Sequence, residues 1–315
     1  MENRMETVFR KKSIICVCAL ICTALWGSAF PCVKAGYNLF AIDSADTASV
    51  ILFAGIRFTG AGVLALILGS LSGRKVLLPK KTSWGRILIL CMFQTVIQYL
   101  FFYISLAHTT GVKGSILEGT GTLFSILFAC LLFRQEPFTK AKLAGCIAGF
   151  AGMVIVNLTG GGFSFEFALT GEGFMIISAV SYGFSSVFIN RFSAKDDPVM
   201  LSGWQFMIGG LILTLAGFIS GGRLRAASPK AIILLIYMMF ISAAAYSLWG
   251  ILLKYNTVSQ ISIFGFMIQV FGSVFSAIFL KEGSSIGINT VIALVLVCLG
   301  IYLVNRGEGK KTRKA

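Results

Sequence analysis

Ten apolar runs of membrane-spanning length fill most of this 315-residue chain. They cover residues 13–33, 48–71, 84–106, 112–133, 141–158, 173–189, 199–219, 231–253, 258–280 and 286–304. A hydrocarbon core of ~30 Å is crossed by about 17–25 helical residues, and every run falls in that window. Because lipid offers the backbone no hydrogen-bond partner, each run should be helical. The pattern predicts an all-α integral membrane protein with ten transmembrane helices.

The charged residues are few and unevenly distributed. They make up 12% of the chain, against about 25% in a typical soluble domain. With the N-terminus in the cytoplasm, 20 of the 27 basic residues fall in cytoplasmic segments and six in external segments, while Arg57 lies within a span. This bias predicts that both termini are cytoplasmic. The net charge of +15 therefore reflects membrane topology, and no nucleic-acid partner is expected.

The residues that would carry metal or cofactor chemistry are missing from the sequence. The chain has a single histidine, His108, and its eight cysteines form no CxxC pair of the metal-binding kind. A membrane-embedded enzyme would need a metal cluster or a catalytic pair. We expect no metal, no cofactor and no enzymatic activity.

The second half of the chain is a diverged copy of the first. Displaced by 147 residues, Leu106, Thr110, Ser115 and Ile116 fall on Leu253, Thr257, Ser262 and Ile263. Displaced by 148, Arg57, Phe58, Gly62, Gly152 and Val156 fall on Gln205, Phe206, Gly210, Gly300 and Val304, and after one gap Glu136 falls on Glu282. Five crossings per half is an odd number, so the two halves should be inverted in the membrane, as in many secondary transporters.

Several local motifs carry a family resemblance. They are Trp26-Gly27-Ser28 followed by Lys34, then Arg57, Glu136-Pro137, and the glycines Gly145, Gly149 and Gly152. With the five-plus-five layout, they make residues 13–305 similar to the drug/metabolite transporter superfamily, specifically its EamA-type ten-helix members. The second half departs from the pattern, with Tyr182 at the tryptophan position and Gln205 at the arginine position.

The resemblance implies a domain plan and a function. Residues 13–158 and 173–305 would be two inverted EamA-like five-helix repeats. An extracytoplasmic linker at 159–172 would join them, with cytoplasmic tails at 1–12 and 306–315. Such proteins export small metabolites, often amino acids, across the bacterial cytoplasmic membrane by alternating access. Members differ widely in substrate, so the resemblance names none.

Two charged residues are predicted deep inside the membrane. Arg57 and Glu118 each cost roughly 2.5–3.5 kcal/mol to place there unpaired, so each should face a partner or a wet cavity. Their predicted depths below the outer surface, ~13 Å and ~9 Å at 1.5 Å per residue, allow an Arg57–Glu118 ion pair. That pair could serve only to lock two helices together.

Eight side chains are the candidate substrate-binding residues around a central cavity. Five should occupy the outer-to-middle layer and three the middle-to-inner layer: Trp26, Arg57, Gln94, Gln98 and Glu118, then Tyr182, Gln205 and Gln269. Plain interhelical hydrogen bonding is an equal alternative for the glutamines. Trp84 and Trp249 are expected at the inner membrane boundary.

The function predicted from these observations is secondary active transport. The expected partners are a small-molecule substrate and the lipid bilayer, with protons as a candidate coupling ion through Glu118. The chain would act as a monomer or a homodimer. One alternative is a phosphorylated-metabolite exchanger, which needs several cavity cations where only Arg57 qualifies. The other is a non-transporting scaffold or a lipid scramblase.

Overall fold

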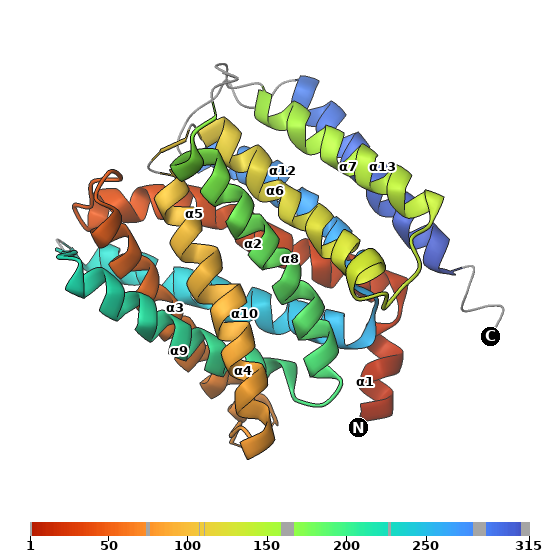
Figure 1. Cartoon of the computed structure of the whole chain (residues 1–315), viewed down its shortest axis with the longest axis horizontal. Coiled ribbons are helices and arrows are strands. Elements are labelled where there is room, and N and C mark those ends of the chain that lie inside the picture. The colour runs from red at the N-terminus through yellow and green to blue at the C-terminus, as the bar shows by residue number, and fades with distance from the viewer. Residues whose placement is uncertain are drawn as a thin grey trace.

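The computed structural model is a bundle of long helices (Figure 1). It describes residues 2–73, 76–106, 108–109, 111–158, 167–225, 228–279 and 288–309. Within these residues there is no strand, and ten helical segments are long and apolar enough to cross a membrane. The predictions of an all-α chain and of ten spans are confirmed.

The helices of the first half follow one another along the chain. They are α2 (Lys12–Leu39), α3 (Thr47–Gly73), a third span made of η1 (Lys81–Ser83), α4 (Trp84–Leu90), η2 (Cys91–Ile97) and α5 (Gln98–Leu106), a fourth made of α6 (Gly111–Leu127) and η3 (Phe128–Leu132), and α7 (Lys140–Leu158). Both η2 and η3 are π-helical turns.

The second half has the same number of spans. They are η4 (Leu169–Gly173) with α8 (Phe174–Ser193), α9 (Pro198–Ile219), α10 (Pro229–Tyr255), a ninth span made of α11 (Val258–Ser262), η5 (Ile263–Phe266) and α12 (Met267–Phe279), and α13 (Ile288–Gly309). Here η4 is a π-helical turn and η5 a 3₁₀ turn.

Most segment ends differ from the prediction by a few residues, and three differences matter for the site and its surroundings. Helix α2 runs past residue 33 to Leu39, with Pro31 inside it. The sixth span begins at Leu169 instead of 173. A second acidic residue, Glu172, therefore lies within a span, in addition to Glu118. The N-terminal tail contains a short helix, α1 (Glu2–Phe9), whose Phe9 ring stacks on Tyr255. Amphipathic ends and aromatic contacts extend helices beyond what apolar length alone indicates.

The closest helix packing joins α3 to α9 and depends on glycine. A Cβ atom on Gly62 would overlap the backbone of Met207, and one on Gly210 would overlap the backbone of Thr59. Gly62 and Gly210 are 148 positions apart, and so are Thr59 and Met207. The same contact is therefore made twice, with the roles of the halves exchanged.

Helices α7 and α13 repeat this arrangement along one edge of the bundle (Figure 1). A Cβ on Gly145 would lie 2.8 Å from the carbonyl oxygen of Gly300, and one on Gly152 the same distance from that of Ala293. These two contacts are again related by a displacement of 148. In both helix pairs, the residue numbers at successive contacts increase along one helix and decrease along the other. The two helices of each pair are therefore antiparallel.

A buried ion pair ties the end of the fourth span to its neighbours. Lys142 bonds to the carboxylate of Glu136, and both side chains are almost fully buried. The other carboxylate oxygen of Glu136 accepts the backbone N–H of Ser259 at 3.1 Å. Cys130 lies between them, 3.8 Å from the Lys142 Nζ and 3.6 Å from the Ser259 Oγ. The start of the ninth span is thereby fixed to the fourth and fifth.

Candidate functional site

Two of the predicted residues, Gln94 and Gln205, bond to each other across the two halves. The Gln205 Nε2 donates to the Gln94 Oε1 at 3.0 Å, and its Oε1 accepts from the Thr95 hydroxyl at 2.6 Å. Gln205 is fully buried and Gln94 nearly so. Both polar atoms of the Gln205 side chain therefore have partners. For this glutamine pair, the structure agrees with the alternative of interhelical hydrogen bonding.

The local backbone helps to present this pair. Gln94 and Thr95 lie on η2, where the helix widens to a π-helical turn. Such turns are rare and often occur at functional sites. The turn lets two consecutive side chains of the third span reach the same residue of α9.

Glu118 and Gln269 form a second group between α6 and α12. The Gln269 Nε2 lies 3.5 Å from the Glu118 Oε2, and the Gln269 Oε1 accepts from the Ser115 hydroxyl at 2.5 Å. Glu118 is partly exposed within the bundle. The Gln269 amide, which is neutral, is therefore at the limit of hydrogen-bond distance from the carboxylate.

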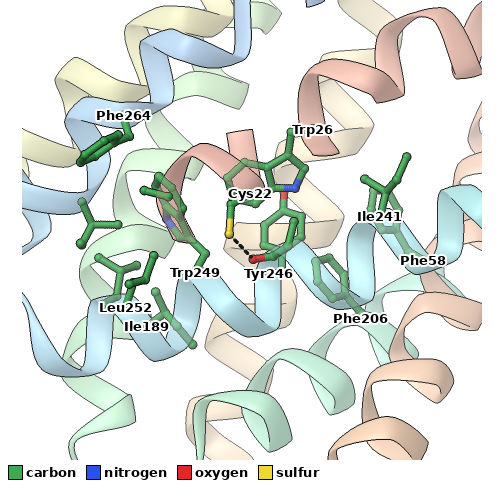
Figure 2. Close-up of a cluster of buried hydrophobic side chains, with 14 of the residues drawn as sticks. Cys22, Trp26, Phe58, Ile189, Phe206, Ile241, Tyr246, Trp249, Leu252 and Phe264 are labelled. Atoms are coloured by element: carbon green, nitrogen blue, oxygen red, sulfur yellow. Dashed lines mark hydrogen bonds between the residues drawn. The ribbon is translucent and has the colours of Figure 1, made fainter. Parts of the chain in front are cut away.

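Trp26 packs against two aromatic side chains of α10. Its ring centroid is 4.8 Å from that of Tyr246 and 5.0 Å from that of Trp249, both edge-on. Figure 2 shows the three rings together, with Phe206 on the far side of Tyr246 from Trp249. The boundary position expected for Trp249 is wrong, because its side chain is 2% exposed and packs on Trp26.

Arg57 makes few contacts for a buried cation. It is 5% exposed, donates from Nη2 to the Ser242 hydroxyl at 3.1 Å, hydrogen-bonds to the Tyr103 hydroxyl, and stacks over the Phe58 ring at 5.1 Å. No Arg57–Glu118 ion pair is formed, and among the described residues no carboxylate pairs with Arg57. The predicted pairing of the two in-span charges is therefore not realised.

At the centre of the site, aromatic residues that occupy matching positions in the two halves contact each other. Tyr99 and Tyr246 are 147 positions apart, and their hydroxyls hydrogen-bond at 2.7 Å. Phe58 and Phe206, 148 apart, stack with centroids 5.3 Å apart. The charges of Arg57 and Glu118 both act on the Tyr99 hydroxyl. The Tyr99 hydroxyl is therefore within range of both charged groups.

The sequence analysis missed Thr95, Tyr99, Ser242 and Tyr246. The displacement of 147 that aligns the ends of the third and eighth spans continues unbroken through them, pairing Thr95 with Ser242 and Tyr99 with Tyr246. Extending the alignment inward would have found all four.

Several polar atoms of the predicted residues are buried without a partner. They are the Trp26 Nε1, the Arg57 Nε, the Gln98 Oε1 and the Tyr182 hydroxyl. A buried polar group almost always has a hydrogen-bond partner, so each exception calls for an explanation. These four come from α2, α3, α5 and α8, and the charge of Glu118 acts on Tyr182.

Two surface hollows among the described residues lie away from the predicted site residues. One lies between α2 and α10, beside Ala35 and Tyr237, and the other lies beside Leu52 and Phe218 at the ends of α3 and α9. The central cavity expected around the eight residues stays a prediction.

Comparison with known proteins gives a consistent family match. Residues 13–158 and 169–306 match the profile of the EamA-like transporter family. A WAT1-related chloroplastic protein of Arabidopsis thaliana is 26% identical over 294 residues, covering 90% of this chain and 67% of the relative. The uncharacterized transporter YvbV of Bacillus subtilis is 25% identical over 284 residues, covering 89% of this chain and 88% of the relative.

A solved structure described only as a crystal structure of a protein has the same fold. Its TM-score is 0.75 at 18% identity, and the superposition covers 93% of this chain and 96% of the other. At that identity the likeness shows the fold alone.

Proposed function

The chain belongs to the EamA-like transporter family, and on that premise we propose that it is a secondary active transporter that exports a small metabolite such as an amino acid. Transport would proceed by alternating access of two inverted halves. The proposal places both termini in the cytoplasm of a bacterial cell, as the charge distribution predicts.

The exchanged contacts support the inverted arrangement. Counterpart helices α3 and α9 pack antiparallel, as do α7 and α13, with glycine contacts that interchange under a displacement of 148. A two-fold relation produces such self-complementary interfaces. Two halves joined in this way can exchange conformations, which is the basis of alternating access in transporters built from inverted repeats.

The observation that carries the proposal is that four polar atoms, one on each of α2, α3, α5 and α8, are buried without a partner. Trp26 and Arg57 each offer an N–H donor, Tyr182 offers a hydroxyl, and Gln98 offers a carbonyl acceptor. A solute with both acceptors and donors would satisfy them, and an amino acid has both. The aromatic rings of Tyr99 and Tyr246 would cover its apolar part.

Counterflow in proteoliposomes tests the proposal. Metabolites that accumulate in the medium of overexpressing cells would be screened, and each one loaded into vesicles containing the purified full chain. We expect saturable, trans-stimulated uptake of a labelled solute. Flux without saturation would indicate a channel, and no trans-stimulated flux for any screened metabolite would reject the carrier assignment.

Glu118 is the proposed coupling group. It is an in-span carboxylate whose charge acts on Tyr99, and the neutral Gln269 lies at hydrogen-bond distance from it. A Glu118→Gln variant should keep counterflow but lose the response to an imposed pH gradient. Unchanged pH-driven uptake would remove Glu118 from the coupling mechanism.

A further inference from the structure

We propose that Arg57 binds an oxyanion of the transported solute, and that the substrates are therefore solutes with a carboxylate group. This inference rests on the proposed function, since it assigns a substrate class to the same site. It is carried by a contrast between Arg57 and its counterpart Gln205, which occupy equivalent positions in the two halves.

The two positions contact equivalent partners. Arg57 donates to the Ser242 hydroxyl, while Gln205 accepts from the Thr95 hydroxyl. Thr95 and Ser242 are themselves 147 positions apart, so the two hydrogen bonds are copies of one contact. The local frameworks around the two side chains therefore correspond.

The remaining contacts differ. Gln205 also bonds to Gln94, whereas the counterpart of Gln94 is Ile241, an apolar residue that is fully buried. The Arg57 Nε is left buried with no acceptor. At the neutral side chain each polar atom has a partner, whereas the charged side chain has a nitrogen without one.

The groups in contact with Arg57 are neutral. The Tyr103 hydroxyl accepts a hydrogen bond from the guanidinium, the Tyr99 hydroxyl lies near it, and the guanidinium stacks over the Phe58 ring. The charge of Glu118 acts on the same two hydroxyls, but Glu118 forms no ion pair with Arg57. Arginine keeps its charge in proteins, so burial cannot be relieved by loss of a proton. Hydroxyls and a ring do not neutralise it. An oxyanion would accept the free Nε–H, and guanidinium groups bind such anions with paired hydrogen bonds.

The charge of the site favours a carboxylate over a phosphate. Sites for phosphate groups use clusters of cations or a guanidinium with further donors. Among the described in-span residues near the tyrosine pair, Arg57 is the one cation. One guanidinium balances one carboxylate. The aromatic side chains Trp26, Tyr99 and Tyr246 suit a solute with an apolar body.

Ligand-induced thermal stabilisation of the purified full chain tests the assignment. The probes are 3-phenylpropionate, phenylalanine, phenylalaninamide and inorganic phosphate. We expect the two carboxylates to raise the melting temperature of the wild type, and the amide and phosphate to leave it unchanged. Equal stabilisation by phenylalanine and its amide would overturn the proposal, as would stabilisation by phosphate alone or by no probe.

Two substitutions sharpen the test. Arg57→Gln, which copies the residue of the other half, should weaken carboxylate binding about 10- to 100-fold, the usual range for a hydrogen bond to a charged group. Arg57→Lys should keep the preference for acid over amide. Arg191→Gln, which removes an exposed arginine at the end of α8, is the matched control and should bind as the wild type.

A purely structural role for Arg57 predicts a different result. It would lower the melting temperature of unliganded Arg57→Gln while leaving the acid-to-amide preference intact, and that result would overturn the proposal. We expect unliganded Arg57→Gln to melt at or above the wild-type temperature, because a poorly compensated buried charge is lost. Counterflow separates the two hypotheses: saturable transport without acid preference rejects only the oxyanion site, whereas no transport rejects the carrier function.

Discussion

Arg57 and Gln205 occupy matching places in the two halves, yet their surroundings have diverged. Each polar atom of the Gln205 side chain has a partner, in Thr95 and Gln94. Arg57 keeps the matching hydroxyl of Ser242, but the counterpart of Gln94 is the apolar Ile241. The comparison indicates that one copy of the position stabilises the bundle, while the other keeps a buried N–H donor without an acceptor.

Making the two positions alike should have the largest effect. A Gln205→Arg substitution buries a second cation among neutral groups, and we expect it to destabilise the protein by about 3 kcal/mol. Unfolding midpoints in detergent and the monodisperse fraction after purification measure the effect. Gln205→Met, which loses hydrogen bonds without adding charge, should cost less. Equal stability of the two variants would mean that charge does not distinguish the positions.

Gln94 and Gln98 offer a matched pair on one span. Gln94→Leu should destabilise the protein by about 1–3 kcal/mol, because it leaves the Gln205 amide buried without its acceptor. Gln98→Leu removes an acceptor that has no donor, so its unfolding midpoint should match the wild type while solute binding weakens. A larger loss of stability for Gln98→Leu than for Gln94→Leu would contradict the assignment of bonded and open positions.

The tyrosine pair tests whether the halves are coupled at their centre. Tyr99→Phe and Tyr246→Phe should each destabilise by about 0.5–1.5 kcal/mol, the net value of a typical hydrogen bond. The double variant should lose less than the sum, since each single change leaves one hydroxyl unpaired. Additive losses in a double-mutant cycle would show that the two hydroxyls do not interact.

The smallest expected difference lies between the two hydroxyl partners. Thr95→Val leaves the Gln205 carbonyl oxygen buried without its donor, at a cost of about 1 kcal/mol. Ser242→Ala should cost less, because the Arg57 guanidinium keeps its hydrogen bond to the Tyr103 hydroxyl. The two unfolding midpoints, measured side by side, should preserve this order. A larger loss of stability for Ser242→Ala than for Thr95→Val would mean that the Arg57–Ser242 contact stabilises the protein more than the Gln205–Thr95 contact.

The sequence predicted the spans well because hydrocarbon leaves the backbone no alternative to the helix. It also predicted which polar residues are buried, since Gln94, Gln205 and Arg57 stand out within apolar runs. It did not predict their partners. Whether Arg57 meets Glu118 or Ser242 depends on the rotation and crossing of helices, which side-chain packing sets and apolar length does not report.

The errors have a physical pattern. Trp249 looked interfacial because it lies near a span end, but the ring packs on Trp26 in the interior. Glu172 was placed outside a span because the sixth helix begins with the π-helical turn η4, which carries little apolar signal. In both cases contacts with distant residues outweighed the local pattern.

The reactivity of the Cys130 thiol can be used to measure conformational opening of the native chain. Its thiol is enclosed by Lys142 and Ser259, so a water-soluble maleimide can reach it only after those neighbours separate. The rate of its alkylation would count opening events at that end of the bundle without any engineered cysteine. Exposed Cys16 and Cys298 and partly exposed Cys18 and Cys32 would first be replaced by alanine. The labelling that a further Cys130→Ala substitution abolishes then records the separation of the ninth span from the fourth and fifth.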